Sequence, residues 1–262
     1  MFIIIDLDGV VYRGKKDIPG APETIARLRA RGHRIHFLTN NSSLTRQGFS
    51  RRLLSMGIKC RKEEIMSSGY ATVSFLKKRG LRGNVFVIGG QGLAREIVKA
   101  GFRVVDNNSY QKIDYVAVGM DRHFVYRDLY IAQQAILKGA LFLATNADPT
   151  YPVENGVCPG AGAMVSAIKT ATNTPPIIIG KPNPFILKEI LQGAGVPKQE
   201  AIIVGDRLDS DILLGHRAGI KTVLVLTGIT SHEEAARLKK ETRPDYVVKN
   251  IKGLLKLKKA GF

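Results

Sequence analysis

The chain has 262 residues, a net formal charge of +18 and a hydrophobic fraction of 44%. This composition is typical of a globular protein with one or two domains and excludes a disordered or fibrous chain. No apolar run approaches the roughly 18 residues of a membrane span, and the apolar run 2–5 lacks the basic flank of a signal peptide. Two cysteines are too few for a disulfide framework, so we expect a cytoplasmic protein without a membrane partner.

The positive charge is distributed along the chain, with short basic runs such as 27–31 and 77–79. Solvated helix faces and helix C-termini account for runs of this kind. Nucleic-acid binding favours a contiguous basic patch interleaved with aromatic residues, and the chain has no such tract and no tryptophan. We therefore expect no nucleic-acid partner and interpret the charge as a field that attracts small anionic substrates.

Short apolar runs alternate with amphipathic stretches from one end of the chain to the other. The predicted strands are 2–6, 34–39, 85–88, 115–118, 141–145, 177–179, 201–204 and 221–226. The predicted helices include 21–31, 44–56, 126–138 and 185–192. Several strands are unbroken apolar runs, which is typical of buried parallel strands. The alternation predicts an α/β fold with a mostly parallel sheet and right-handed crossovers.

Glycines follow most of the helical stretches and precede an apolar residue or a strand. They are Gly32, Gly57, Gly101, Gly139, Gly195 and Gly219. Glycine adopts the left-handed conformation that ends many helices without a steric penalty. We therefore predict that these six glycines end helices.

Carboxylates cluster after two of the predicted strands. Strand 2–6 ends in Asp6, and Asp8 follows on the same side, a combination that is costly unless a cation or phosphate chemistry uses it. Strand 201–204 is followed by the acidic segment 205–211. Functional groups of parallel sheets gather at the carboxyl ends of the strands, so these carboxylates are expected to form the oxygen-ligand site that Mg²⁺ prefers. Turns and helix caps would explain each cluster taken alone.

Groups suited to an anion follow two further strands. Thr39 and Asn40 supply hydroxyl and amide groups, with exposed backbone N–H groups before a helix. Lys181 follows strand 177–179 and also precedes a helix. Four strand ends of this kind in one chain indicate a common site.

These motifs resemble the haloacid dehalogenase superfamily of phosphohydrolases and, within it, the p-nitrophenylphosphatase-like (NagD-type) branch. The matching segments are 6–14 (DLDGVVYRG), 38–42 (LTNNS), 159–162 (PGAG), 180–184 (GKPNP) and 205–211 (GDRLDSD). The resemblance covers nearly the whole chain. It implies a Rossmann-like core, a doubly wound parallel sheet, with a second, smaller inserted α/β cap domain.

The resemblance also implies roles for the carboxylates. Asp6 would attack phosphorus and form an aspartyl-phosphate, while Asp8 would act as general acid and then as general base. The cofactor Mg²⁺ would be held by the Asp6 carboxylate, the Asp8 backbone carbonyl and Asp206, with Asp211 supporting the same loop.

Phosphate binding would fall to Thr39, Asn40 and Lys181 by the same resemblance. The segment 145–152 resembles the substrate-specificity loop of the family. It makes Asn146, Asp148 and Tyr151 candidate selectors, although turn chemistry explains the loop equally well.

The spacing of the motifs places the insertion after the second one. Only 33 positions separate Asp6 from Thr39, whereas 142 separate Thr39 from Lys181. We therefore predict a catalytic core formed by 1–79 and 179–262, and a cap domain formed by 80–178.

The expected function is Mg²⁺-dependent hydrolysis of small phosphate monoesters, with a small phosphorylated metabolite as the substrate. One alternative is a phosphoryl transferase or mutase of the same superfamily, and another is a basic nucleotide- or RNA-binding protein on this scaffold. The physiological substrate and the oligomeric state are left open, with a homodimer as one alternative.

Overall fold

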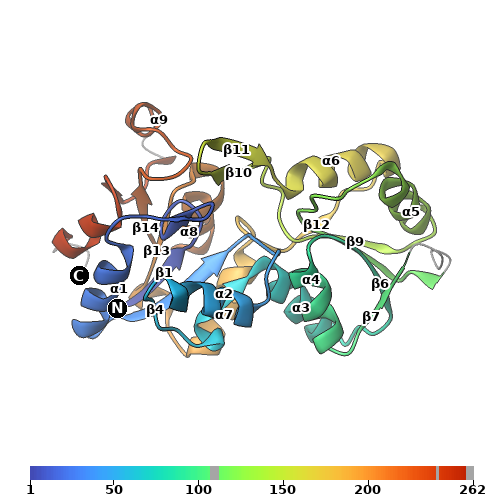
Figure 1. The fold of residues 1–262 in the computed structure, drawn as a ribbon, viewed down its shortest axis with the longest axis horizontal. Helices are drawn as coiled ribbons and strands as arrows, with labels where there is room; N and C mark the ends of the chain where they lie inside the picture. The colour runs from blue at the N-terminus through green and yellow to red at the C-terminus, as the bar shows by residue number, and fades with distance from the viewer. Residues whose placement is uncertain (107–111, 240–241, 258–262) are drawn as a thin grey trace.

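The computed structural model describes residues 1–106, 112–239 and 242–257. Within these residues the chain forms two parallel sheets, one in each lobe of an elongated molecule (Figure 1). The expected α/β fold, with a core sheet and a second, smaller α/β unit, is confirmed. In the part of the chain that the structure describes, every helix is too short or too polar to span a membrane.

The larger sheet has six strands, all paired in parallel. They are β1 (Phe2–Asp6), β4 (Arg34–Thr39), β5 (Ile65–Ser67), β13 (Ala201–Gly205), β14 (Lys221–Val225) and β15 (Tyr246–Val248). Their order is β15-β14-β13-β1-β4-β5, so the chain runs outward in opposite directions from β1. The carboxyl end of β1 is therefore the switch point where doubly wound sheets place their ligands.

The smaller sheet has five parallel strands in the order β12-β9-β8-β6-β7. They are β6 (Asn84–Ile88), β7 (Arg103–Val105), β8 (Tyr115–Val118), β9 (Leu141–Ala144) and β12 (Ile177–Ile178). All of these strands fall within the predicted cap segment 80–178. The exact boundaries of the two domains stay a prediction, and the predicted ranges also include 107–111, 240–241 and 258–262, which lie outside the described residues.

Helices pack on the faces of the two sheets (Figure 1). They are α1 (Ala21–Ala30), α2 (Arg46–Ser55), α3 (Ser68–Lys78), α4 (Gln91–Lys99), α5 (Tyr126–Leu137), α6 (Ala161–Thr172), α7 (Pro184–Ala194), α8 (Leu213–Ala218) and α9 (His232–Ala236). α7 shows how the sequence sets a helix: Asn183 caps its start by accepting the Phe185 N–H at 3.0 Å, and Gly195 ends it with a φ of 62°. All six glycines predicted to end helices have a φ between 62° and 98°.

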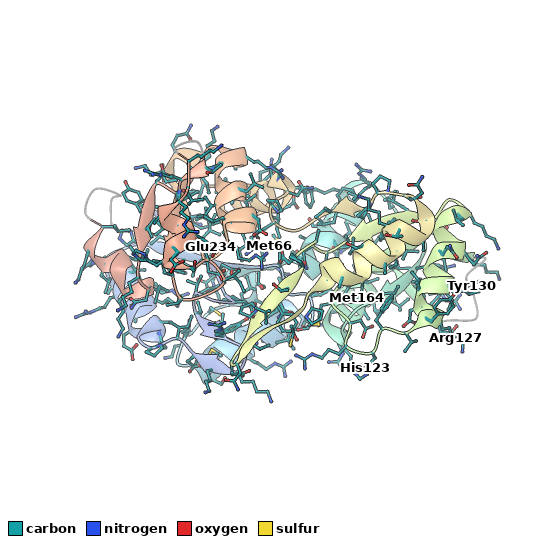
Figure 2. All side chains as sticks on the ribbon, turned by 90° about the horizontal axis from the view of Figure 1, so that it is seen from above. Met66, His123, Arg127, Tyr130, Met164 and Glu234 are labelled. Atoms are coloured by element: carbon teal, nitrogen blue, oxygen red, sulfur yellow. The ribbon has the colours of Figure 1, made fainter. Side chains whose placement is uncertain are left out.

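Two antiparallel hairpins complete the described structure. They are β2 (Tyr12–Arg13) with β3 (Lys16–Asp17), and β10 (Thr150–Val153) with β11 (Gly156–Pro159). The β10–β11 hairpin runs from α6 towards the lobe of the larger sheet (Figure 2). Its tip contacts the β2–β3 hairpin, where Arg13 Nε donates to the Val153 carbonyl at 3.0 Å and the Lys15 N–H donates to Glu154 Oε1 at 2.5 Å.

The hydrophobic core continues from one sheet to the other. Alternate residues of β1 face opposite sides, so that Ile3 and Ile5 belong to one cluster and Phe2 and Ile4 to another. The second of these clusters also contains residues from β6, β8 and β9, including Leu143. The two sheets therefore share buried apolar surface.

All eight predicted strands are present, with ends that differ by at most one residue. Those that the sequence did not predict are short or amphipathic: β2, β3, β5, β7, β10, β11 and β15. Of these, the β10–β11 hairpin bears most directly on function.

Candidate active site

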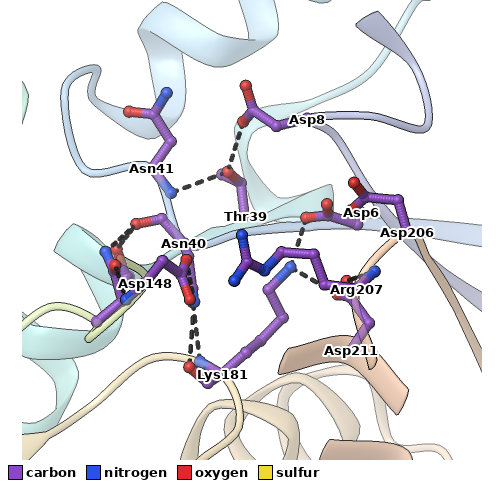
Figure 3. A network of polar contacts seen from close by, with 12 residues as sticks. Asp6, Asp8, Thr39, Asn40, Asn41, Asp148, Lys181, Asp206, Arg207 and Asp211 are labelled. Atoms are coloured by element: carbon purple, nitrogen blue, oxygen red, sulfur yellow. Dashed lines mark hydrogen bonds and ion pairs between the residues drawn. The ribbon is translucent and has the colours of Figure 1, made fainter. Parts of the chain in front are cut away.

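The polar groups expected from the sequence converge at the carboxyl ends of β1, β4 and β13 (Figure 3). β1 lies between the other two strands, with Ile5 in register with Val204 and Asp6 in register with Leu38. The residues that leave each strand are consequently neighbours in space. Parallel pairing of three buried strands thus assembles the site.

Three aspartates form a compact acidic cluster beside β1. Each of Asp6, Asp206 and Asp211 is buried and offers a carboxylate oxygen within 4.8 Å of the others. Asp206 Oδ2 accepts the Ile229 N–H at 2.7 Å, whereas Asp206 Oδ1 is buried without a hydrogen-bond partner among the described residues. Burial, reinforced by the charge of Asp211, raises the pKa of Asp206 to about 7. An orphaned carboxylate oxygen beside two further carboxylates fits a hard divalent cation.

Glycines give the Asp206 side chain the room it occupies. Gly9 has a φ of 85°, and a Cβ built there would lie 2.4 Å from Asp206 Oδ2. At Gly228 a Cβ would lie even closer to the same oxygen. A side chain at either position would displace Asp206 from the cluster.

Lys181 is the cation that contacts the acidic cluster. Its Nζ lies 2.6 Å from both Asp6 Oδ1 and Asp211 Oδ1, and the residue is only 2% exposed. Burial alone lowers the pKa of Lys181, but the charges of Asp211 and Asp6 outweigh burial and hold the pKa above its usual value. Burial also raises the pKa of Asp6, and the Lys181 charge opposes that rise. The ammonium therefore stays charged and fixes the orientation of the Asp6 carboxylate.

Asp8 lies beside the end of β4, close to Thr39 and away from Lys181 (Figure 3). Thr39 Oγ1 donates to Asp8 Oδ2 at 3.3 Å. Burial raises the pKa of Asp8, while the charges of Arg52 and Lys181 lower it. The Arg52 guanidinium lies 3.6 Å above the ring of Tyr12, which places a cation on the strand-end loop that carries Asp8. A carboxyl group whose protonated form is favoured by burial is suited to donate a proton.

Asn40 joins the two lobes through its side chain. Its Nδ2 donates to Asp148 Oδ2 at 2.9 Å and to the Lys181 carbonyl at 3.1 Å, while its Oδ1 accepts the Lys181 N–H at 2.8 Å. The Asn40 carbonyl in turn accepts from Asn146 Nδ2 at 2.7 Å and from Ser68 Oγ at 2.5 Å. The predicted role of Asn40 in phosphate binding therefore rests on its backbone N–H group, because its amide is engaged elsewhere.

The structure brings Asn146, Asp148 and Tyr151 to the same cavity as the catalytic candidates. Asn146 and Asp148 face Asn40, and the Asp148 N–H donates to Asn146 Oδ1 at 3.1 Å. Tyr151 lies on β10, and its hydroxyl accepts from Arg122 Nη2 at 3.0 Å. The three residues thus line the side of the site that the smaller lobe supplies.

The cavity itself is small, about 60 Å³, and lies between the two lobes. Asp6, Asp8, Thr39 and Lys181 are among its lining residues. Sequence reasoning gave no individual role to several lining residues, namely Met120, Pro152, Ala161, Arg207 and Ser210, of which only Met120 lies outside the motif segments. Met120 follows β8, so its place after a predicted strand was the available signal.

Arg207 is the most informative of the missed residues. Its guanidinium binds both oxygens of Asp209, with Nε–Oδ1 and Nη2–Oδ2 distances of 3.1 and 2.8 Å. Its Nη1 donates to the Thr150 carbonyl at 3.3 Å, at the base of the β10–β11 hairpin. Arg207 therefore ties the loop after β13 to the hairpin. Its position directly after Asp206 was the signal in the sequence.

Comparisons with known proteins agree with this geometry. Residues 3–103 match the family model described as haloacid dehalogenase-like hydrolase, and residues 178–254 match a second model described as HAD-hydrolase-like. An acid sugar phosphatase of Staphylococcus haemolyticus is 36% identical over 250 residues, which covers 95% of this chain and 92% of that protein.

Solved structures give the same result. A 4-nitrophenylphosphatase from Thermotoga maritima is 36% identical, with a TM-score of 0.89 over 97% of this chain and 96% of that one. A glycerol phosphate phosphatase from Mycobacterium tuberculosis, solved in complex with magnesium, is 33% identical, with a TM-score of 0.87 over 97% of this chain and 75% of that one. The expectation from the motifs is therefore confirmed: the chain belongs to the haloacid dehalogenase-like hydrolase family, in its p-nitrophenylphosphatase-like branch.

Proposed function

We propose that this chain is a Mg²⁺-dependent phosphatase that hydrolyses small phosphate monoesters through an aspartyl-phosphate at Asp6. The observation that carries the proposal is the buried contact of Lys181 with Asp6 and Asp211, next to the orphaned oxygen of Asp206. A buried cluster of four ionisable groups is costly for folding, and it opens onto a cavity. Perturbed ionisable groups in a cavity are typical of catalytic sites.

In the first step Asp6 attacks phosphorus. A bond forms between a carboxylate oxygen of Asp6 and the phosphorus, and the bond from phosphorus to the alcohol oxygen breaks. Lys181 holds Oδ1 of Asp6 and leaves Oδ2 free of its hydrogen bond. Asp8 donates its proton to the departing alcohol, which leaves neutral.

In the second step Asp8 reverses its role. Its carboxylate accepts a proton from a water molecule, whose oxygen attacks phosphorus as the bond to Asp6 breaks. The products are inorganic phosphate and the free Asp6 carboxylate. Thr39, the Asn40 backbone N–H and Lys181 bind the phosphoryl oxygens, where negative charge concentrates.

Asp6, the Asp8 carbonyl and Asp206 are the proposed ligands of Mg²⁺, with Asp211 in support. When bound, the cation offsets the charge of the carboxylates and of the phosphoryl group. The same residues contribute without it by orientation, since Asp206 is fixed by the Ile229 N–H and Asp211 Oδ2 accepts the Arg207 N–H at 3.2 Å.

The smaller lobe, which we take as a cap formed by 80–178, selects the leaving group. Its contribution to the cavity combines apolar groups such as Met120 and Tyr151 with the carboxylate of Asp148. The small size of the cavity favours a small phosphorylated metabolite over a folded macromolecule. A cytoplasmic location accompanies this proposal as a prediction from the sequence, and the oligomeric state stays open, with a homodimer as one alternative.

The test is phosphate release from a panel that includes a sugar phosphate, glycerol phosphate and 4-nitrophenyl phosphate. Wild type is measured with Mg²⁺ and with EDTA, next to Asp6→Asn and the exposed control Asp17→Asn. We expect turnover that requires Mg²⁺ and falls by at least about 10⁴-fold in Asp6→Asn, because the nucleophile is lost. No turnover by the folded wild type on any compound would overturn the proposal.

A further inference from the structure

A second cavity lies at the other end of β4 from the candidate active site. It measures about 700 Å³ and is lined by the N-terminal half of β4, including Arg34 and His36, and by residues of α3 and α7. We call it the β4 groove. No group of the proposed phosphatase mechanism lines it.

Most of the charged groups of the β4 groove are balanced by partners. Glu64 pairs with Arg29 at 3.5 Å and with Arg61 at 3.9 Å. Glu189 pairs with Lys78 at 2.5 Å. These contacts account for three of the five cations that line the groove.

Arg34 and Arg46 are the remaining two cations. Neither forms an ion pair with a carboxylate in the described part of the chain. Each guanidinium instead covers an aromatic ring, Arg34 at 5.3 Å from the centroid of Phe2 and Arg46 at 3.4 Å from that of Tyr70. Arg34 Nη2 also donates to the Ala194 carbonyl at 2.9 Å. A stacked guanidinium keeps its N–H donors at the edge, where the other N–H groups of Arg34 and those of Arg46 can reach an anion.

His36 lines the same groove as these two cations. The residue is 7% exposed, and its Nε2 has no hydrogen-bond partner among the described residues. Burial, followed by the charges of Arg46 and Arg34, lowers the pKa of His36 to about 4. Both guanidinium charges therefore act on the histidine ring, so that an anion bound between them would be sensed there.

We propose that the β4 groove binds a phosphate dianion between Arg34 and Arg46. Two cations without carboxylate partners match the two negative charges, and the planar guanidinium fork binds phosphate in a bidentate manner. The aromatic rings are already covered, so the groove recognises the phosphate group and does not stack a base. The source is either free inorganic phosphate or the phosphate of a small ester.

The test is NMR of the full-length protein with ¹⁵N-labelled histidine, in EDTA to prevent turnover. Inorganic phosphate and adenosine monophosphate are titrated separately, and the His36 ring resonance is followed. We expect the resonance to shift in a saturable way with inorganic phosphate, with adenosine monophosphate or with both, and the pattern identifies the source. Phosphate bound only at the active site would leave His36 unshifted and would overturn the proposal.

Variants separate the groove from general charge effects. Arg46→Gln and Arg34→Gln each remove a charged hydrogen bond to the phosphate. Each should therefore raise the phosphate concentration at which the His36 shift is half-complete by about tenfold or more. Arg61→Gln is the matched control, because Arg61 lines the same groove but is paired with Glu64. Equal affinity in all three variants, or an equal shift with citrate in place of phosphate, would refute the phosphate site.

Discussion

Two buried polar clusters meet at Lys181 and differ in how they are built. The charged cluster consists of Asp6, Lys181, Asp206 and Asp211. The amide cluster consists of Asn40, Ser68, Asn146 and Asp148. In the charged cluster one cation faces three carboxylates, and an oxygen of Asp206 is left without a partner. In the amide cluster the side-chain oxygen and nitrogen of Asn40 are both engaged.

The difference shows where the fold accepts an electrostatic cost. Burying a carboxylate costs several kcal/mol unless it is paired, so an unbalanced cluster is retained only where a ligand or a reaction uses it. The amide cluster joins the two lobes through the hydrogen bonds of Asn40 and Asn146, and Asp148 is its single carboxylate. This contact between the lobes therefore needs no excess of buried charge. The comparison therefore assigns the charged cluster to the proposed reaction and the amide cluster to the contact between the two lobes.

The largest expected effect on stability is that of Lys181→Met. The substitution leaves Asp6 and Asp211 buried without their cation, which should destabilise the fold by about 3–5 kcal/mol. It should also reduce kcat by about 10²–10³-fold, because a donor to the phosphoryl group is removed. Urea unfolding and phosphate release measure the two effects. Lys188→Met, at an exposed position of α7, should change neither, and equal losses in both variants would contradict the assignment.

Asp206→Asn should not lower the stability of the metal-free protein, in contrast to Lys181→Met. Asparagine keeps an oxygen for the Ile229 N–H but removes one of three mutually repelling carboxylates, so the metal-free protein should be at least as stable as wild type. The Mg²⁺ concentration needed for half-maximal activity should rise by at least about tenfold. Thermal unfolding in EDTA tests the expected stability, and a Mg²⁺ titration of activity tests the expected metal dependence. A metal-free variant that is less stable than metal-free wild type would refute the repulsion between the carboxylates.

The pH dependence of stability gives a further test of the charged cluster. The pKa of Asp206 is about 7 in the folded protein against an ordinary value of 3.8. Between these values the folded state holds a proton that the unfolded state has released. In EDTA this group therefore contributes stability that is complete below pH about 4 and is lost as the pH rises through 7. Asp206→Asn should show a flatter profile of unfolding free energy over this range, and an unchanged slope would count against the shifted pKa.

The smallest effect is expected in the amide cluster. Asn40→Ala leaves the Lys181 N–H and Asp148 without a partner and should cost about 1–3 kcal/mol of stability. Because Asp148 is released from its position, KM should change more than kcat. Asn41→Ala is the comparison variant, since Asn41 also lines the cavity but its side chain accepts the Ser43 N–H within its own loop at 2.9 Å. A fall of kcat as large as that of Lys181→Met would show that the two clusters are not separable.

The sequence predicted the fold and the members of the charged cluster because both depend on local patterns. An unbroken apolar run such as β1 identifies a buried strand, and the residue that ends it must lie at the edge of the sheet. Asp6 and Asp206 occupy such positions in the larger sheet, and Lys181 lies three residues beyond β12 of the smaller sheet. Their convergence follows from the strand order of the folded protein, which apolar runs alone do not give.

The remainder depends on contacts between distant segments. The strands of the β10–β11 hairpin are four residues each, and none of the residues of β11 is buried, so no core pattern marks them. The amide of Asn40 is engaged by partners more than 100 positions away, and Arg207 reaches Thr150 across 57 positions. Neither spacing nor composition encodes such partners. Sequence reasoning therefore did not predict the side-chain partners of Asn40 and overlooked Arg207.

The tip of the β10–β11 hairpin and the two lobes are held together by different kinds of contact. The two lobes share buried apolar surface, and separating them would expose it at roughly 25 cal/mol per Å². The hairpin tip is held mainly by hydrogen bonds such as those of Arg13 and Lys15, each of which contributes only about 1 kcal/mol. Displacing the hairpin tip therefore breaks hydrogen bonds that water can replace, whereas separating the lobes would also expose apolar surface.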